Sequence, residues 1–213
     1  SIREYICNFI MSTLETNLIQ PSTGTSLTIG ASGDTITIPS GATITNSGTA
    51  TGFGGTSIVN TWYLTSDLNP VPTTNSNVLI TAFTEYTSAP YAKVGSSMSN
   101  SSGIWTFPET GIYKISSTLQ FEEYGNAYSG KNGIIIEATT DNSNYSTADV
   151  KYSWLDGSAG GACHCFVDLD LIIDVTSTSN VKVKFFYLSQ ATTILNGGSA
   201  NSSKITFEKI GNT

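Results

Sequence analysis

The sequence predicts an all-β protein built from antiparallel sheets, and two observations support this fold class. After Gly111 the residues alternate between an apolar and a polar face, which is typical of a half-buried strand in an antiparallel sheet. Charged residues make up only 12% of the chain, about half the share in an average soluble domain. Aromatic residues at 10% and many β-branched runs argue against a disordered linker.

The totals exclude several classes of protein. A chain of 213 residues suits one domain with an appendage. A formal net charge of -7 argues against nucleic-acid binding, and no apolar run approaches the roughly 20 residues of a membrane span. Three cysteines, an odd count, argue against a disulfide framework and favour assembly in a reducing compartment. The first residues do not form a persuasive signal peptide, because Glu4 and Asn8 interrupt their apolar run.

Residues 1–26 are interpreted as an N-terminal anchoring arm. Ile2, Ile6, Phe9 and Ile10 fit one face of a short helix that ends before Pro21. Such an arm would dock on a partner, and a frayed tail is the alternative. The sequence leaves both open.

Residues 27–55 are interpreted as a stem, because short Thr/Ile segments recur between Gly33, Gly41 and Gly48, about every eight residues. Each unit has too few apolar residues to bury a core alone, and such repeats become stable when stacked. Three intertwined chains would bury Leu27, Ile29, Ile36, Ile38 and Ile44. A flexible linker is the alternative. These repeats are similar to the shafts and connectors of bacteriophage fibres.

Residues 56–213 are interpreted as the head, organised around 103–121. Two strand-like runs meet there at a turn, where Pro108 donates no hydrogen bond and Gly111 tolerates unusual backbone angles. We expect further strands at 58–64, 78–85, 133–139, 149–155, 162–175, 181–187 and 204–210. The predicted core consists of Trp105, Phe107, Tyr113, Ile115, Leu119, Phe121, Leu169, Leu171, Val183, Phe185 and Phe207.

An aromatic residue and Phe-Pro, followed by Gly-Ile-Tyr at the start of a strand, resembles the central signature of C1q/TNF-like domains. The resemblance covers roughly Trp62 to Ile210 and implies a ten-stranded jelly roll that assembles as a trimer. In such a fold, loops at the ends of the sandwich form recognition surfaces. The residues that we expect to contact a host surface there are Tyr128, Lys131, Asp156, Asn196 and Asn201.

The runs at 162–175 and 181–187 are predicted to form a hairpin. If Val175 pairs with Val181, Asp174 lies across from Lys182, a pairing that contributes roughly 0.2–1 kcal/mol. The reverse face of this hairpin would expose four large apolar residues, which predicts a subunit contact. These residues are Phe166, Ile172, Phe186 and Leu188.

No catalytic site or cofactor is expected. Cys163, His164 and Cys165 are consecutive and lack the separation of a zinc site. Asp168, Asp170 and Asp174 share a strand face and are weak candidates for calcium, which some C1q-like trimers hold. Glu122 and Glu123 are expected on a solvated loop edge, pointing to opposite faces, and not as an acid/base pair.

These features together predict a non-enzymatic virion structural protein. It would be a homotrimeric fibre, spike or capsid decoration that is assembled in the host cytoplasm and exposed on a phage particle. The arm would contact capsid or tail proteins, and the head would adhere to host glycans or proteins. A secreted C1q-like recognition module, with a signal peptide and a collagen stalk, is one alternative. A fibre-borne polysaccharide depolymerase, with carboxylates in a groove between chains, is the other.

Overall fold

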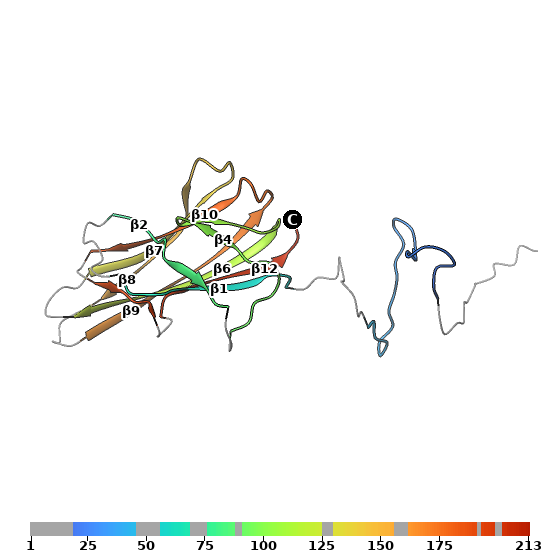
Figure 1. Ribbon diagram of the computed structural model, residues 1–213, viewed down its shortest axis with the longest axis horizontal. Helices are drawn as coiled ribbons and strands as arrows, with labels where there is room; N and C mark the ends of the chain where they lie inside the picture. The colour runs from blue at the N-terminus through green and yellow to red at the C-terminus, as the bar shows by residue number, and fades with distance from the viewer. Residues whose placement is uncertain are drawn as a thin grey trace, which may run out of the picture. The chain divides into compact units, whose positions relative to one another are not determined.

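The computed structural model describes residues 19–45, 56–68, 76–87, 91–124, 130–155, 162–190, 193–198 and 202–213. The contacts divide the chain into two compact units, Ser1–Thr51 and Gly52–Thr213 (Figure 1). Every strand among the described residues belongs to the second unit, and this part of the chain contains no α-helix. The predicted helix in the arm and the end of the stem after residue 45 lie outside the described residues.

The second unit, which we call the head, is a sandwich of two antiparallel sheets. Sheet A has the order β11-β6-β12-β1-β3, and β9 also pairs with β6. Its strands are β1 (Val59–Leu64), β3 (Phe83–Glu85), β6 (Gly111–Tyr124), β9 (Ala162–Val175), β11 (Ile194–Leu195) and β12 (Lys204–Gly211). Sheet B has the order β4-β5-β10-β7-β8, and β2 also pairs with β10. Its strands are β2 (Val78–Leu79), β4 (Ser99–Ser101), β5 (Ile104–Thr106), β7 (Gly130–Thr139), β8 (Ser146–Leu155) and β10 (Lys182–Ser189).

The order in which the chain visits the sheets is that of a jelly roll. From β5 in sheet B it crosses to β6 in sheet A, returns for the β7–β8 hairpin, crosses to β9, returns for β10 and ends in β12 of sheet A. Figure 1 shows the two layers, with β10 in the upper one and β9 in the lower one. Alternation between two packed sheets is the double-sheet arrangement of jelly rolls. The all-β fold class is therefore confirmed.

Strand β6 is internal to sheet A, where it pairs with β12 and β11 as well as with β9. Its side chains alternate between a buried and a half-buried face, as expected for such a strand. Its residues from 113 to 121 point alternately into the sandwich, where they are buried, and outward, where they are half-buried. It pairs with β9 from Gly111 opposite Val175 to Tyr124 opposite Ala162. At its start Gly111 has a φ of 146°, and a Cβ there would collide with Lys209 and the Gly211 carbonyl oxygen. The turn before β6 therefore requires glycine.

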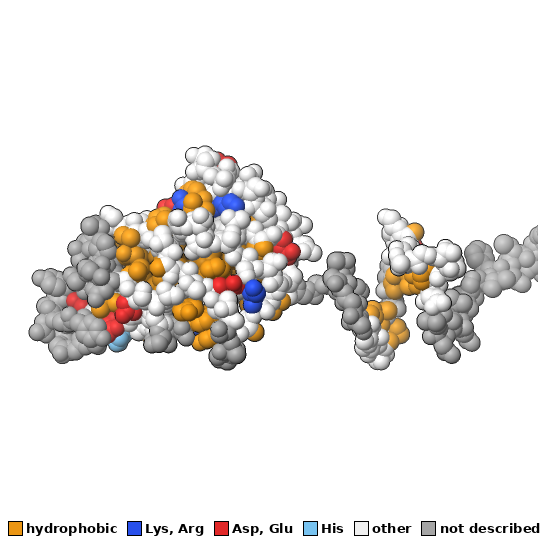
Figure 2. Space-filling model, viewed as in Figure 1, with side chains coloured by type: hydrophobic (Ala, Val, Ile, Leu, Met, Phe, Trp, Pro, Cys, Tyr) orange, Lys and Arg blue, Asp and Glu red, His pale blue; other side chains and the backbone are white. Residues whose placement is uncertain are grey.

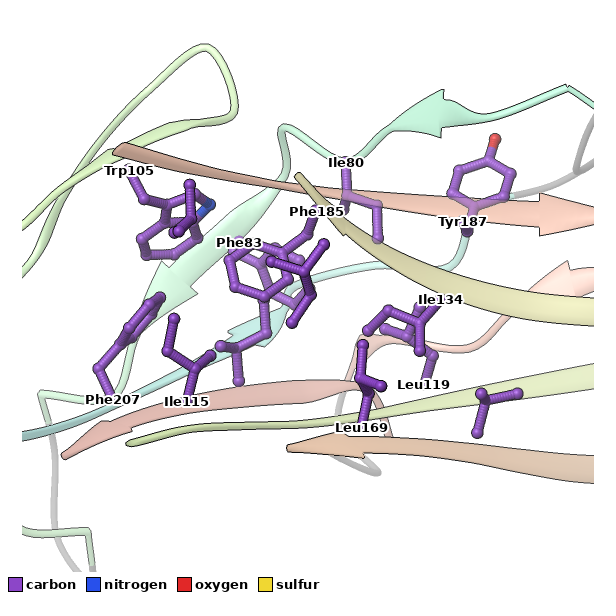
Figure 3. Close-up of a cluster of buried hydrophobic side chains, with 14 of the residues drawn as sticks. Ile80, Phe83, Trp105, Ile115, Leu119, Ile134, Leu169, Phe185, Tyr187 and Phe207 are labelled. Atoms are coloured by element: carbon purple, nitrogen blue, oxygen red, sulfur yellow. The ribbon is translucent and has the colours of Figure 1, made fainter. Parts of the chain in front are cut away.

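The core lies between the two sheets and is rich in aromatic rings (Figure 3). The Trp105 ring contacts those of Phe185 and Phe207, with centroids 5.9 and 5.0 Å away. The residues that the sequence places in the core are buried in the structure, except Leu171, which is half-buried at the rim. Side chains from opposite sheets thus meet in one continuous core.

The predicted hairpin between 162–175 and 181–187 is wrong, because β9 and β10 belong to different sheets. Asp174 lies opposite Ile112 on β6, whereas Lys182 lies opposite Thr106 and Thr139. The Lys182 ammonium donates hydrogen bonds to Thr106 Oγ1 at 2.9 Å and to the Thr178 carbonyl at 2.7 Å. Pairing with β6 along its whole length gives β9 a longer ladder than the shorter β10 would provide.

The single strand expected at 78–85 is also wrong, because the chain changes sheets within it. Strand β2 pairs with β10 in sheet B, and β3 pairs with β1 in sheet A. Ile80, between them, is buried in the core. The segment 78–85 is apolar at successive positions because its two ends join different sheets.

Candidate interaction surfaces

Residues 19–45 form turns and unpaired segments, and none of these described residues belongs to a strand. One turn is closed by Asp34 N–H donating to the Ala31 carbonyl at 3.0 Å, and the next by Ala42 N–H donating to the Pro39 carbonyl at 3.1 Å. Gly33 and Gly41 hold the third position of these turns with φ values of 94° and 87°. A positive φ there is what a type II turn requires.

The apolar side chains before, between and after these turns are exposed. They are Leu27, Ile29, Ile36, Ile38 and Ile44, with exposed fractions from 45% to 63%. Within the pairs 27/29 and 36/38 they stand at alternate positions, as on one face of a strand. Each described repeat thus presents apolar side chains together with backbone segments that pair with no described strand. Both kinds of group favour addition of another strand.

The outer face of sheet A carries two large exposed apolar side chains on β9. Phe166 lies opposite Gln120 and is 54% exposed, and Ile172 lies opposite Lys114 and is 65% exposed. Between them, Asp170 lies 3.6 Å from the Lys114 ammonium. A hydrogen bond from Ser116, with the nearby charge of Lys114, lowers the pKa of the Asp170 carboxyl. The face therefore mixes apolar and ionic contacts.

Phe186 and Leu188 do not share this face, which corrects the single apolar surface predicted for the hairpin. They lie on β10, in sheet B, opposite Ile135 and Gly133 on β7. Leu188 is buried, with 5% of its surface exposed, and Phe186 is half-buried. The reason is again the separation of β9 and β10 into two sheets, which directs their outer residues to opposite sides of the sandwich.

The three calcium candidates are spread along β9. Alternate residues of a strand are roughly 7 Å apart, and Asp174 is two such steps beyond Asp170. Asp168 accepts a hydrogen bond from Thr118 Oγ1 at 2.6 Å, and Asp170 pairs with Lys114. Among the described residues, no group of three or more His, Cys, Asp or Glu side chains could hold a metal ion.

The side chains of the Cys-His-Cys run point in alternate directions. His164 is exposed, with Nδ1 3.2 Å from Gln120 Nε2 and Nε2 3.7 Å from the Glu122 carboxylate. Cys165 is buried, and burial raises the pKa of its thiol. The three side chains therefore do not converge on one point.

The solvated loop edge predicted for Glu122 and Glu123 is wrong, because β6 continues through both residues to Tyr124. Their exposed fractions are 8% and 5%. Glu122 accepts a hydrogen bond from Asn196 Nδ2 at 2.7 Å, and β11 pairs beside it. Glu123 Oε2 is buried without a hydrogen-bond partner among the described residues. As expected for adjacent strand residues, Glu122 and Glu123 face opposite sides of the sheet.

Of the residues expected to contact a host, Tyr128, Asp156 and Asn201 lie outside the described residues. Asn196 bonds inward, since its backbone N–H donates to the Gln120 carbonyl and its side chain to Glu122. It lines a shallow polar pocket with Ser66, Asp67, Glu122, Gly197, Gly198 and Ser202. Lys131 is on β7, at the outer face of sheet B.

The outer face of sheet B carries a row of exposed side chains on the strand that the sequence predicts at 149–155, a surface that was not predicted. Val150, Tyr152 and Trp154 stand on β8, the edge strand, and Trp154 is 67% exposed. The β7 residues opposite them are Ile135, Gly133 and Lys131. The signal in the sequence was three large residues at alternate positions, and only the structure shows that they face outward.

No protein-family model matches the chain, and no curated protein matches it in sequence. Two crystal structures of murine APRIL, determined at pH 5.0 and pH 8.5, are similar to it with TM-scores of 0.44 and 0.43. Their sequence identities to this chain are 11% and 12%, and each match covers 71% of this chain and 98% of the APRIL chain. Among the described residues, no helix is sufficiently long and apolar to cross a membrane.

Proposed function

We propose that this protein is a non-enzymatic structural and adhesive protein of a bacteriophage particle that works as a homotrimer. Residues 1–26 attach it to capsid or tail proteins, the stem intertwines with two other copies, and the head projects outward. It forms a fibre, a spike or a capsid decoration and contacts the host surface. The observation that carries the proposal is the row of exposed apolar side chains in the described part of the stem, at alternate positions and without a strand partner.

A second and third copy of the same chain cover this row most simply. Each copy offers the same apolar residues at the same spacing, separated by the same type II turns. Burying the exposed part of one such side chain contributes on the order of 1 kcal/mol. Five such side chains per chain contribute to the stability of the stem, and pairing of stacked repeats would add backbone hydrogen bonds.

The outer face of sheet A supports contact between heads. It presents Phe166 and Ile172 to solvent, and large apolar side chains on an outer face favour a covering surface. Figure 2 shows few charged side chains on the visible face of the head, in keeping with the low charge of the chain.

Adhesion by such a protein relies on many copies of a weak binding site and not on one tight site. Three heads on one stem, repeated over a particle, raise the effective concentration of a weak site near its ligand. Overall binding then exceeds that of one head by orders of magnitude.

Light scattering on stem variants tests the proposal. Wild-type protein is expected to have three times the 22.5 kDa mass of one chain. Replacing Ile36 and Ile38 with Asp should abolish the trimer, because the charges would lie in its apolar interior. Replacing Thr35 and Thr37 with Asp is the matched control, on the other face of the same segment, and should leave the trimer intact. A monomeric wild type, or equal behaviour of the two variants, would refute the intertwined stem.

Electron microscopy of the parent particle tests the location. Particles labelled with antibody against the head should show projections at defined sites on the capsid or tail. Particles that lack the label, although the protein is present in the infected cell, would contradict a structural role in the virion.

A further inference from the structure

We propose that the outer face of sheet B binds a saccharide that carries a carboxylate. Its site, which we call the aromatic row, consists of Trp154 and Tyr152 on β8 with Lys131 and Gly133 on β7. This inference rests on the proposed adhesive function and specifies both the ligand class and the surface that binds it.

Tyr152 is held in place by its neighbours on β7. It lies opposite Gly133, and its ring occupies the position that a Cβ on residue 133 would take. The Lys131 ammonium lies 4.3 Å from the centroid of the same ring. The ring therefore covers bare backbone at Gly133 and has a cation over its face. A side chain fixed in this way loses little conformational entropy when a ligand binds.

Trp154 extends the row toward the end of the sandwich. It lies directly opposite Lys131, the residue whose ammonium lies over the Tyr152 ring, so Lys131 is a β7 neighbour of both aromatic residues. At 67% exposure, its indole is the most exposed of the large hydrophobic side chains in the described part of the chain. Aromatic side chains contribute large contact areas at low entropic cost, which makes such a residue a strong anchor for a ligand.

The chemistry of the row matches that of an acidic sugar. An aromatic ring has a negative face, which attracts the slightly positive C–H groups on the flat side of a sugar ring. The Lys131 ammonium forms no salt bridge with another described residue, so it is available to a carboxylate. On a chain of net charge -7, the Lys131 cation, which neighbours two aromatic residues, provides local charge complementarity for an anionic ligand.

The position and size of the row favour a saccharide over a second copy of the chain. Sheet B faces away from the side of the sandwich that carries Phe166 and Ile172, so head contacts through sheet A leave the row open. Together with Val150, the exposed side chains of β8 extend the aromatic row to a strip roughly 14 Å long, from Val150 to Trp154, and one strand wide. This suits a few sugar rings in line, whereas a stable protein interface needs about 800 Å² on each partner.

Calorimetry on the full chain with matched saccharides tests this inference. The panel contains hexamers of mannuronate and galacturonate and 3'-sialyllactose, each beside its neutral counterpart: mannohexaose, galactohexaose and lactose. At least one acidic saccharide should bind, about tenfold or more tighter than its neutral counterpart, which corresponds to about 1.4 kcal/mol. Binding should also change the fluorescence of Trp154, the exposed tryptophan.

Variants assign the binding to the row. Trp154→Ala should lower the affinity at least about tenfold, and Trp154→Phe should retain most of it, because phenylalanine keeps a stacking face. Lys131→Met should reduce the acidic preference to the level of the neutral sugar. Tyr91→Ala, which removes an exposed aromatic side chain outside the row, is the control and should bind like wild type.

Two results would overturn the inference: no member of the panel binds at millimolar concentration, or Trp154→Ala binds as well as wild type. Light scattering on the same samples separates this inference from the proposed trimer. Saccharide binding by a monomer would refute the trimer and leave the site intact. A trimer that binds no saccharide would refute the site alone.

Discussion

Trp105 of sheet B meets Trp62 of sheet A edge-on, with ring centroids 4.8 Å apart and ring planes at 85°. This geometry directs the positive edge of one ring at the negative face of the other. Trp105 is fully buried and also contacts Phe83, Phe185 and Phe207. One side chain thus joins strands β1, β3, β10 and β12 across the core.

Replacing Trp105 with Ala should lower the free energy of unfolding by about 3–5 kcal/mol, the usual cost of emptying a buried aromatic site. Trp154→Ala is the matched control, because it removes the same side chain from an exposed position and should change stability by about 0.5 kcal/mol or less. Urea unfolding followed by circular dichroism measures both. If both variants lowered the free energy of unfolding by the same amount, Trp105 would not be a core residue.

Tyr113 allows packing and hydrogen bonding to be separated. Its ring is buried against Phe107, and its hydroxyl donates to the Glu109 carbonyl at 3.0 Å. Tyr113→Ala should cost about 3–5 kcal/mol, whereas Tyr113→Phe should cost only about 0.5–1.5 kcal/mol, since it loses one hydrogen bond. Thermal unfolding of the two variants tests this order, and an unchanged midpoint for Tyr113→Ala would refute it.

Designed disulfides distinguish the observed pairing from the hairpin that the sequence suggested. Ser116 lies opposite Asp170, and opposed residues on antiparallel strands have Cα separations that a disulfide bridges. Cysteines at these two positions should form a disulfide in non-reducing peptide maps. Cysteines at Asp174 and Lys182 should not, because those residues are in different sheets. A disulfide between positions 174 and 182, with none between 116 and 170, would instead support the predicted hairpin.

The ion pair between Glu109 and Lys209 should make stability depend on pH. A hydrogen bond from the Lys209 ammonium, at 2.7 Å, lowers the pKa of the Glu109 carboxyl in the folded state. A lowered folded pKa contributes stability above the unfolded pKa, and this contribution is lost as the pH falls through the folded value. Because Glu109 is half-exposed, the effect should stay below about 1 kcal/mol.

The measurement is the unfolding free energy of Glu109→Gln and wild type at pH 7 and at pH 3. The variant should be less stable at pH 7, and the difference should shrink at pH 3. Glu137→Gln, at a carboxylate without a salt bridge among the described residues, should show no such trend. A difference that grows as the pH falls would contradict the ion pair.

Local patterns in the sequence predicted the strands well, because period-two alternation in 113–121 and 167–175 depends only on which face is buried. Partner choice depends on residues far apart in the chain, and there the prediction failed. Asp174 and Lys182 are close in sequence and opposite in charge, but β9 finds a longer partner in β6. The change of sheet at Ile80 was not predicted either, because it also depends on strand partners far away in the sequence.

The interaction surfaces were less predictable than the strands. Phe166 and Ile172 were correctly expected to be exposed, because they share one face of their strand with the charged residues Asp168 and Asp170. Leu188 was not predicted to be buried, since its face depends on which sheet receives β10. The aromatic row required knowledge that Gly133 lies opposite Tyr152, a pairing set by the register of β7 and β8.

The central claim is that the stem needs two further copies to cover its apolar side chains, and native mass spectrometry of the full chain beside a 56–213 fragment tests it most directly. The full chain should have three times the mass of one polypeptide at micromolar concentration, and the fragment should keep its β-sheet circular dichroism while its association weakens. A full chain that remains a single polypeptide under these conditions would contradict the account.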